Sequence, residues 1–177
     1  MFMKRNLRAL FIAIVAFAAT AGVASAVADA SRVSVNWAPS DTLSEVKQNP
    51  THRGLQRPED WMKELSRYIR ERANAQLPPG QQLDVTIDDI KLAGDFEPWH
   101  GPNAQDIRFM KDIYPPRIEL HYRLIGADGK TVRESQAKLR DLSYLHENVM
   151  PTDTDPLRYD KHMIDTWVRT EFHRDKT

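Results

Sequence analysis

Two extended segments joined by a glycine-containing turn constrain the fold more than any other feature of this sequence. From Arg117 to Leu124, apolar residues alternate with charged or polar ones, which is the period of a strand with one solvent-exposed face. The turn Gly126–Gly129 follows, and a second extended segment ends near Arg140. The sequence therefore predicts a β-hairpin with a four-residue loop.

The first 26 residues predict a cleaved secretory signal peptide. Basic residues precede an uncharged apolar run, Ala9–Gly22, and Ala24-Ser25-Ala26 fits an A-x-A cleavage site. Cleavage after Ala28 is the alternative. The apolar run is shorter than the roughly 18–20 residues of a membrane-spanning helix, which argues against an anchor. We therefore expect residues 27–177 to form a single periplasmic domain with no membrane span.

Charge and cysteine content narrow the possible partners. The chain carries 25 basic and 25 acidic side chains. Three of the basic ones lie in the predicted signal peptide, so the rest of the chain is slightly acidic. A chain with this charge balance is not expected to have the basic surface that nucleic acids require. The absence of cysteine excludes disulfides, so stability has to come from a hydrophobic core.

The remaining elements predict an α+β fold. Strands are expected at Arg32–Trp37 and Leu83–Gly94, with a long loop over residues 38–57. Helices are expected from Pro58 and from Pro156, each with an apolar stripe at helical spacing. The element order is then β-α-β-β-β-α. Because the hairpin has one polar face, both helices should cover the other face, giving a two-layer α/β sandwich with a mixed or antiparallel sheet of about four strands.

A change in the alternation of the second strand predicts a β-bulge. Leu83, Val85 and Ile87 share one parity, whereas Ile90 and Leu92 have the other. A regular strand cannot bury both sets on one face, so an extra residue near Asp88-Asp89 is needed to restore the phase. Half-burial of both sheet faces is the alternative explanation.

Four residues are candidates for binding a small ligand or a metal ion. Asp88 and Asp89 could form a carboxylate cluster for acid–base chemistry or a hard cation, although Asp is also common at bulges and strand ends. Trp99 and His100 lie in a proline- and glycine-flanked loop, where a tryptophan is expected to pack or to bind. Packing of Trp99 under its loop is the preferred interpretation, and stacking on a ligand is the alternative.

Two arginines complete the set of candidate binding residues. Arg108 and Arg117 flank an apolar segment, and Asp89 and Asp141 lie beside predicted strands. Partly buried charges need partners, so structural Arg–Asp pairing is preferred to an anion-binding site.

The sequence contains none of the motifs that usually identify a catalytic or metal site. A G-x-S-x-G elbow, a glycine-rich phosphate loop, an H-E-x-x-H helix and an EF-hand spacing are all absent. The six histidines are scattered. We therefore predict no catalytic residues, no metal site and no cofactor.

Short segments along most of the chain resemble a bacterial family of secreted proteins, domain of unknown function 3016 (DUF3016). The resemblance rests on the following segments: Val35-Asn36-Trp37-Ala38-Pro39, Asp89–Gly94, Ile107-Arg108, Pro115–Ile118 with Tyr122, Leu139-Arg140-Asp141 and Asp165-Thr166-Trp167. The resemblance implies a periplasmic protein of Gram-negative bacteria, and it implies no particular activity or ligand.

These observations favour a binding domain over an enzyme. The first expectation is a non-catalytic periplasmic domain that binds an envelope protein or a small molecule. The alternative is a small-ligand- or metal-binding protein, with hydrolysis as one reaction it could carry, that uses Asp88, Asp89, Trp99 and His100.

Overall fold

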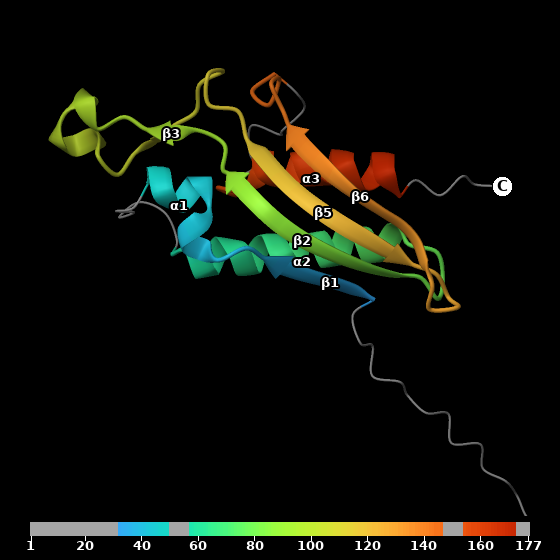
Figure 1. The fold of residues 1–177 in the computed structure, drawn as a ribbon. Helices are drawn as coiled ribbons and strands as arrows, with labels where there is room; N and C mark the ends of the chain where they lie inside the picture. Colours follow the sequence, from blue (N-terminus) through green and yellow to red (C-terminus); the bar gives the residue numbers. More distant parts are fainter. Residues whose placement is uncertain (1–31, 50–56, 147–153, 173–177) are drawn as a thin grey trace, which may run out of the picture.

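A four-stranded mixed sheet forms one layer of the protein, and two helices form the other (Figure 1). The computed structural model describes residues 32–49, 57–146 and 154–172, so the predicted signal peptide lies outside the described residues. The strand order is β1-β2-β5-β6, where the strands are β1 (Val33–Trp37), β2 (Gln82–Lys91), β5 (Arg117–Ile125) and β6 (Thr131–Arg140). β1 and β2 are parallel, and the other pairs are antiparallel.

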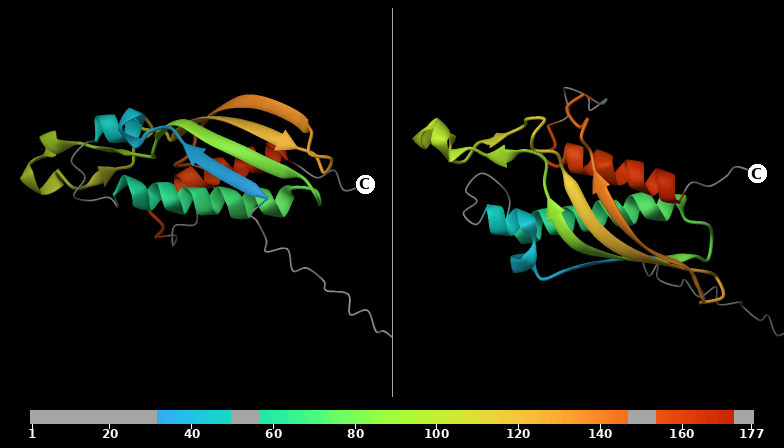
Figure 2. Two further views of the ribbon diagram at one scale, coloured as in Figure 1. Left: turned by 60° about the horizontal axis from the view of Figure 1, so that its bottom comes forward. Right: turned by 45° about the horizontal axis from the view of Figure 1, so that its top comes forward.

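Both long helices pack on the same face of the sheet (Figure 2). They are α2 (Pro58–Gln76) and α3 (Arg158–Glu171). The prediction of an α+β fold with two helices on one face is therefore confirmed. Among the described residues, no helix has the length and apolar content needed to cross a membrane.

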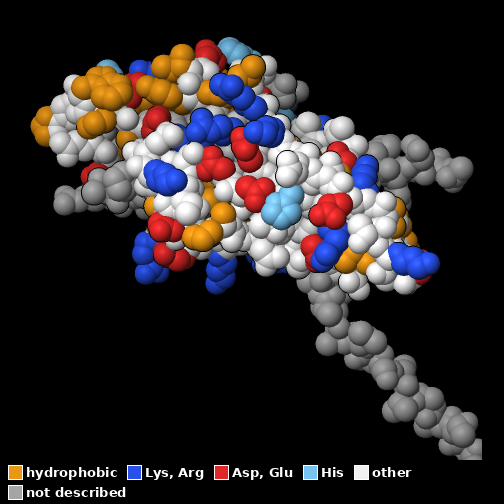
Figure 3. Space-filling model, viewed as in Figure 1, with side chains coloured by type: hydrophobic (Ala, Val, Ile, Leu, Met, Phe, Trp, Pro, Cys, Tyr) orange, Lys and Arg blue, Asp and Glu red, His pale blue; other side chains and the backbone are white. Residues whose placement is uncertain are grey.

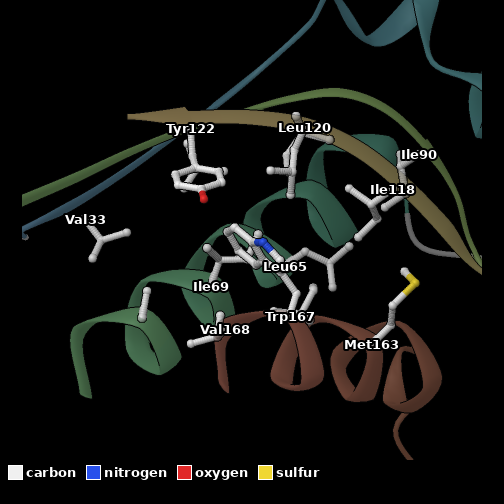
Figure 4. Packing of buried hydrophobic residues seen from close by; sticks show 14 of the residues in the cluster. Val33, Leu65, Ile69, Ile90, Ile118, Leu120, Tyr122, Met163, Trp167 and Val168 are labelled. Atoms are coloured by element: carbon white, nitrogen blue, oxygen red, sulfur yellow. The ribbon is translucent and has the colours of Figure 1, made fainter. Parts of the chain in front are cut away.

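The core lies between the hairpin strand β5 and the two helices (Figure 4). Every second residue of β5 from Ile118 to Leu124 is buried, as the alternation predicts. These side chains meet Leu65 and Ile69 of α2 and Trp167 of α3. The hydrophobic effect on these apolar stripes is what holds the two layers together.

The predicted bulge lies in β2. The register between β2 and β5 shifts between Ile87 and Asp89, which leaves Asp88 as the extra residue. The shift allows Ile87 and Ile90 to be buried on the same face although their parity differs. A second shift in the hairpin lies opposite Leu124 and Ile125, close to Val132.

The long loop expected at residues 38–57 contains a helix that periodicity did not predict. Helix α1 (Ser44–Gln48) is a single short turn whose Glu45 side chain is completely buried. A segment of five residues is too short to show an amphipathic period, which explains why the sequence pattern did not reveal it.

Residues 95–116 form a projection at one end of the sheet, which we call the arm (Figure 1). Its base is a two-stranded ribbon of β3 (Asp95–Phe96) and β4 (Arg108–Phe109). Two 3-10 turns, Pro98–His100 and Pro102–Ala104, form its tip. The sequence analysis placed Trp99 and His100 of this region in a loop.

Gly94 connects the arm to β2, and we predict that Gly94→Ala is destabilising. Gly94 has a φ of +77°, and an added Cβ would lie 2.7 Å from Met110 Sδ and 2.8 Å from the Phe109 carbonyl oxygen. We expect a loss of about 2–3 kcal/mol in the free energy of unfolding, measured with urea. Gly129 also has a φ of +77° but open space around its Cα. Gly129→Ala should therefore lose only about 1 kcal/mol, and equal losses in the two variants would contradict the close contact at Gly94.

Candidate functional site

A buried carboxylate, that of Glu45, connects the arm to the body of the protein. Its Oε1 accepts hydrogen bonds from both terminal nitrogens of Arg108, at 2.7 and 3.0 Å. Its Oε2 accepts from Lys91 Nζ at 3.0 Å and from the Leu92 amide at 3.1 Å. The side chains of Lys91 and Arg108 are only 8% and 9% exposed. One carboxylate thus connects helix α1, the end of β2 and strand β4.

A second buried carboxylate, that of Asp160, approaches the same junction from α3. Asp160 Oδ1 accepts a hydrogen bond from the Ala93 amide at 3.1 Å, while the Ala93 carbonyl accepts one from Arg108 Nε at 2.8 Å. Asp160 Oδ2 has no hydrogen-bond partner among the described residues. Burial raises the pKa of the Asp160 carboxyl to about 7. We call Glu45, Lys91, Arg108 and Asp160 the ionic cluster.

Within the arm, a third carboxylate fastens the tip to the base. Glu97 is buried and accepts hydrogen bonds from Lys111 Nζ, at 2.6 and 2.8 Å, and from the Tyr114 hydroxyl at 2.8 Å. His100 Nε2 lies 2.7 Å from Glu97 Oε2. The Lys111 ammonium holds the pKa of the Glu97 carboxyl below its ordinary value. These bonds give the arm a defined shape despite its small amount of regular secondary structure.

Three large apolar side chains of the arm are exposed to solvent. Trp99, Ile107 and Ile113 are 70%, 51% and 72% exposed. Hydrophobic side chains gather over this part of the molecule in Figure 3, whereas charged side chains are more frequent over the sheet. An exposed tryptophan and two exposed isoleucines on one projection are unusual for a surface that contacts only water. We call these three residues the arm patch.

The structure separates the two pairs that the sequence grouped into one ligand site. At the β2 bulge, Asp88 lies 2.9 Å from His121 Nδ1 on the exposed face of the sheet. Asp89 accepts hydrogen bonds from the Ser44 amide at 2.6 Å and the Ser44 hydroxyl at 2.7 Å. Its carboxylate therefore holds the start of α1, a structural role.

The aromatic pair lies at the tip of the arm instead. Trp99 and His100 share the turn Pro98–His100, with ring centroids 6.2 Å apart. The His100 ring also lies 5.1 Å from Phe109. The expectation that Trp99 packs under its loop is wrong, because Trp99 is 70% exposed.

Arg108 forms a structural ion pair, as the sequence analysis preferred, but its partner is a glutamate and not the expected aspartate. Arg108 pairs with Glu45 because α1 brings a buried carboxylate next to β4. Arg117 is half-buried at the first position of β5, in register with Lys91 and Arg140. Asp141 accepts a hydrogen bond from the Ser143 amide.

Among the described residues, no group of three or more His, Asp or Glu side chains is arranged to hold a metal ion. A surface groove of about 730 Å³ lies between α2 and the start of α3. Lys161 and Glu64 in its wall bind each other at 2.7 Å, and Lys161 also binds Asp155 at 2.6 Å. The charges of Lys161, Glu64 and Asp155 are therefore paired with one another.

The fold and the site define a small α+β domain that presents an apolar patch on an arm fixed by buried charges. The chain belongs to the family described as protein of unknown function (DUF3016), whose model matches residues 31–170. This match agrees with the resemblance drawn from the short sequence segments. No curated protein and no solved structure matches the chain.

Proposed function

We propose that this protein is a non-catalytic binding domain of the bacterial cell envelope, and that it contacts a partner protein through the arm patch. The observation that carries the proposal is the exposure of Trp99, Ile107 and Ile113 on one projection. Tryptophan and large aliphatic side chains supply much of the energy of protein interfaces when a partner removes them from water.

The way the arm is held supports this proposal. A binding surface that is ordered before contact loses less conformational entropy on association. Arg108 fixes the base of the arm and Glu97 fixes its tip, in each case through charge-assisted hydrogen bonds that involve a buried carboxylate. The arm is therefore organised in advance, while its apolar side chains remain free to contact a partner.

The electrostatics favour a protein over a lipid surface. Residues 95–116 contain four acidic side chains but only two basic ones, Arg108 and Lys111, and both of these are bound to carboxylates. Anionic membranes attract clusters of free lysine and arginine, which the arm lacks. The location in the envelope rests on the predicted signal peptide.

In-cell photo-crosslinking at the arm tests the proposal. A photoreactive amino acid at position 99 or 113 should give a discrete adduct, whereas the same amino acid at the exposed position Glu59 of α2 should give none. The combined variant Trp99→Ser, Ile107→Ser should weaken the adduct from position 113, because truncating central anchors commonly removes about 2 kcal/mol or more of binding energy. Adducts of equal yield at positions 59 and 113 would contradict the assignment to the arm.

Cell fractionation tests the compartment separately. We expect the protein in the periplasmic fraction, shortened by 26 or 28 residues at its N-terminus. Recovery of the uncleaved chain from the cytoplasm would exclude the envelope while leaving the arm patch open to a partner elsewhere.

A further inference from the structure

Strand β6 leaves one edge of the sheet unpaired. Within the described chain, β6 pairs with β5 on one side and with no strand on the other. It is ten residues long, twice the length of the opposite edge strand β1, and none of its residues is buried. Figure 1 shows β6 along the outer border of the sheet. A long open edge of this kind is a template for pairing with another strand.

The geometry of antiparallel pairing limits how β6 can pair with a second copy of itself. In an antiparallel pair, two facing residues either both point their backbone N–H and C=O groups at the partner strand or both point them away from it. Because this direction alternates along a strand, two facing residues are both even-numbered or both odd-numbered. One residue then faces its own copy on the twofold axis. The side chains of each sheet face consequently meet only side chains of that same face.

Two of these registers bring opposite charges together twice. Glu134, Gln136 and Lys138 lie on the exposed face of the sheet, as shown by their pairing with Arg123, His121 and Glu119 of β5. In the register centred on Gln136, Glu134 faces Lys138 of the second copy, and the symmetric pair repeats this contact. In the register centred on Ala137, Glu134 faces Arg140 of the second copy instead. A register centred on Glu134 or Lys138 places like charges face to face, which is unfavourable.

Two variants distinguish the register centred on Gln136 from the one centred on Ala137. They are Lys138→Glu and Gln136→Cys, because only the first register places residue 138 opposite residue 134 and residue 136 opposite itself.

The face of β6 that is turned toward the helices is compatible with the same register. Arg133 is held by Glu171 at 3.0 Å and Leu139 is half-buried against the core. In the register centred on Gln136, Arg133 faces Leu139 of the second copy, so the arginine methylenes can cover the exposed part of the leucine. We propose that two copies of this chain associate through β6, around Gln136, to form one continuous sheet. This contact is separate from the arm patch.

Charge reversal tests the proposal on protein purified after expression of the full-length sequence. Sedimentation velocity at micromolar to millimolar concentration should show a reversible dimer. Glu134→Lys and Lys138→Glu should each raise its dissociation constant at least about tenfold, equivalent to about 1.4 kcal/mol, because each places like charges opposite each other twice. The double variant restores both pairs and should recover wild-type affinity. Glu59→Lys, an equal charge change on α2, should have no effect.

A cysteine scan tests the register, and the cysteine-free chain gives no background. In the proposed dimer, residue 136 faces its own copy within disulfide reach. Gln136→Cys should therefore form an intermolecular disulfide on mild oxidation. Val132→Cys, on the same strand, should not, because the two copies of residue 132 lie about 27 Å apart. A monomer at every concentration, or a dimer that tolerates both charge reversals, would overturn the proposal.

Discussion

Glu45→Gln is expected to lose about 3–5 kcal/mol in the free energy of unfolding. The substitution keeps the shape of the side chain but removes the charge that compensates Arg108 and that shares Lys91 with Asp95. Those two cations are almost completely buried, and an uncompensated buried charge is among the most destabilising changes known for single substitutions. Urea unfolding followed by tryptophan fluorescence measures the loss, since Trp61 and Trp167 report on the core.

Glu64→Gln is the matched control for this prediction. Glu64 also faces two cations, Arg67 and Lys161, each at 2.7 Å. Its side chain is 31% exposed, whereas that of Glu45 is 0% exposed. Solvent screens the Glu64 pairs, so its substitution should lose no more than about 1 kcal/mol. Similar losses in the free energy of unfolding for the two variants would show that burial does not determine how much the Glu45 ion pairs stabilise the fold.

A smaller part of the Glu45 effect should appear in the arm itself. Arg108 connects β4 to Glu45, and the Ala93 carbonyl accepts a second bond from the same guanidinium. Without the carboxylate, the arm loses its charged connection to α1. Hydrogen exchange in residues 95–116 of Glu45→Gln should accelerate more than exchange in β5, because opening of the arm no longer breaks the Arg108–Glu45 bonds.

The fold could be predicted because its main elements have clear periods. The alternation from Ile118 to Leu124 and the helical stripes after Pro58 and Pro156 each have one simple structural solution. The parity change around Asp88 had two, and the structure contains the bulge. These patterns correspond to β5, the two long helices and the bulge in β2. These features are specified by the burial of apolar side chains, and buried side chains recur in the sequence at the period of the strand or helix that carries them.

The ionic cluster could not be predicted in the same way, because it depends on contacts between distant segments. Glu45 lies in a five-residue helix with no period, and it meets Arg108 from a two-residue strand. One signal was nevertheless present. Asp160 lies three residues after Leu157 and four before Ile164, so it falls within the apolar stripe of α3. A charged residue in such a stripe indicates a buried polar contact.

The burial of Asp160 leads to a prediction about pH. Its pKa is about 7 in the folded protein, above the ordinary value of 3.8. Between these two values, the folded state keeps a proton that the unfolded chain has released. Stability must therefore fall as the pH rises from about 4 to 7, by up to about 1.4 kcal/mol per pH unit from this group. Above pH 7 the contribution is constant.

Comparison with Asp160→Asn isolates this contribution from the other titrating groups. The amide cannot ionise, so the variant lacks the decline with pH that Asp160 causes. The free energy of unfolding of the variant minus that of the wild type should increase by about 2–3 kcal/mol between pH 5 and pH 7. Calorimetric or urea unfolding at each pH measures it, and the sign is independent of the variant's own stability at any single pH.

Asp84→Asn provides the control, because its environment acts in the opposite direction. Hydrogen bonds from Arg123 and Ser34 hold the pKa of the Asp84 carboxyl below its ordinary value. That group stays ionised in both folded and unfolded states between pH 5 and 7, so the difference from wild type should be flat over this range. A flat difference for Asp160→Asn as well would mean that Asp160 is ionised throughout. In that case Arg108, the cation of the ionic cluster that favours the ionised form of Asp160, would be compensating two carboxylates rather than one.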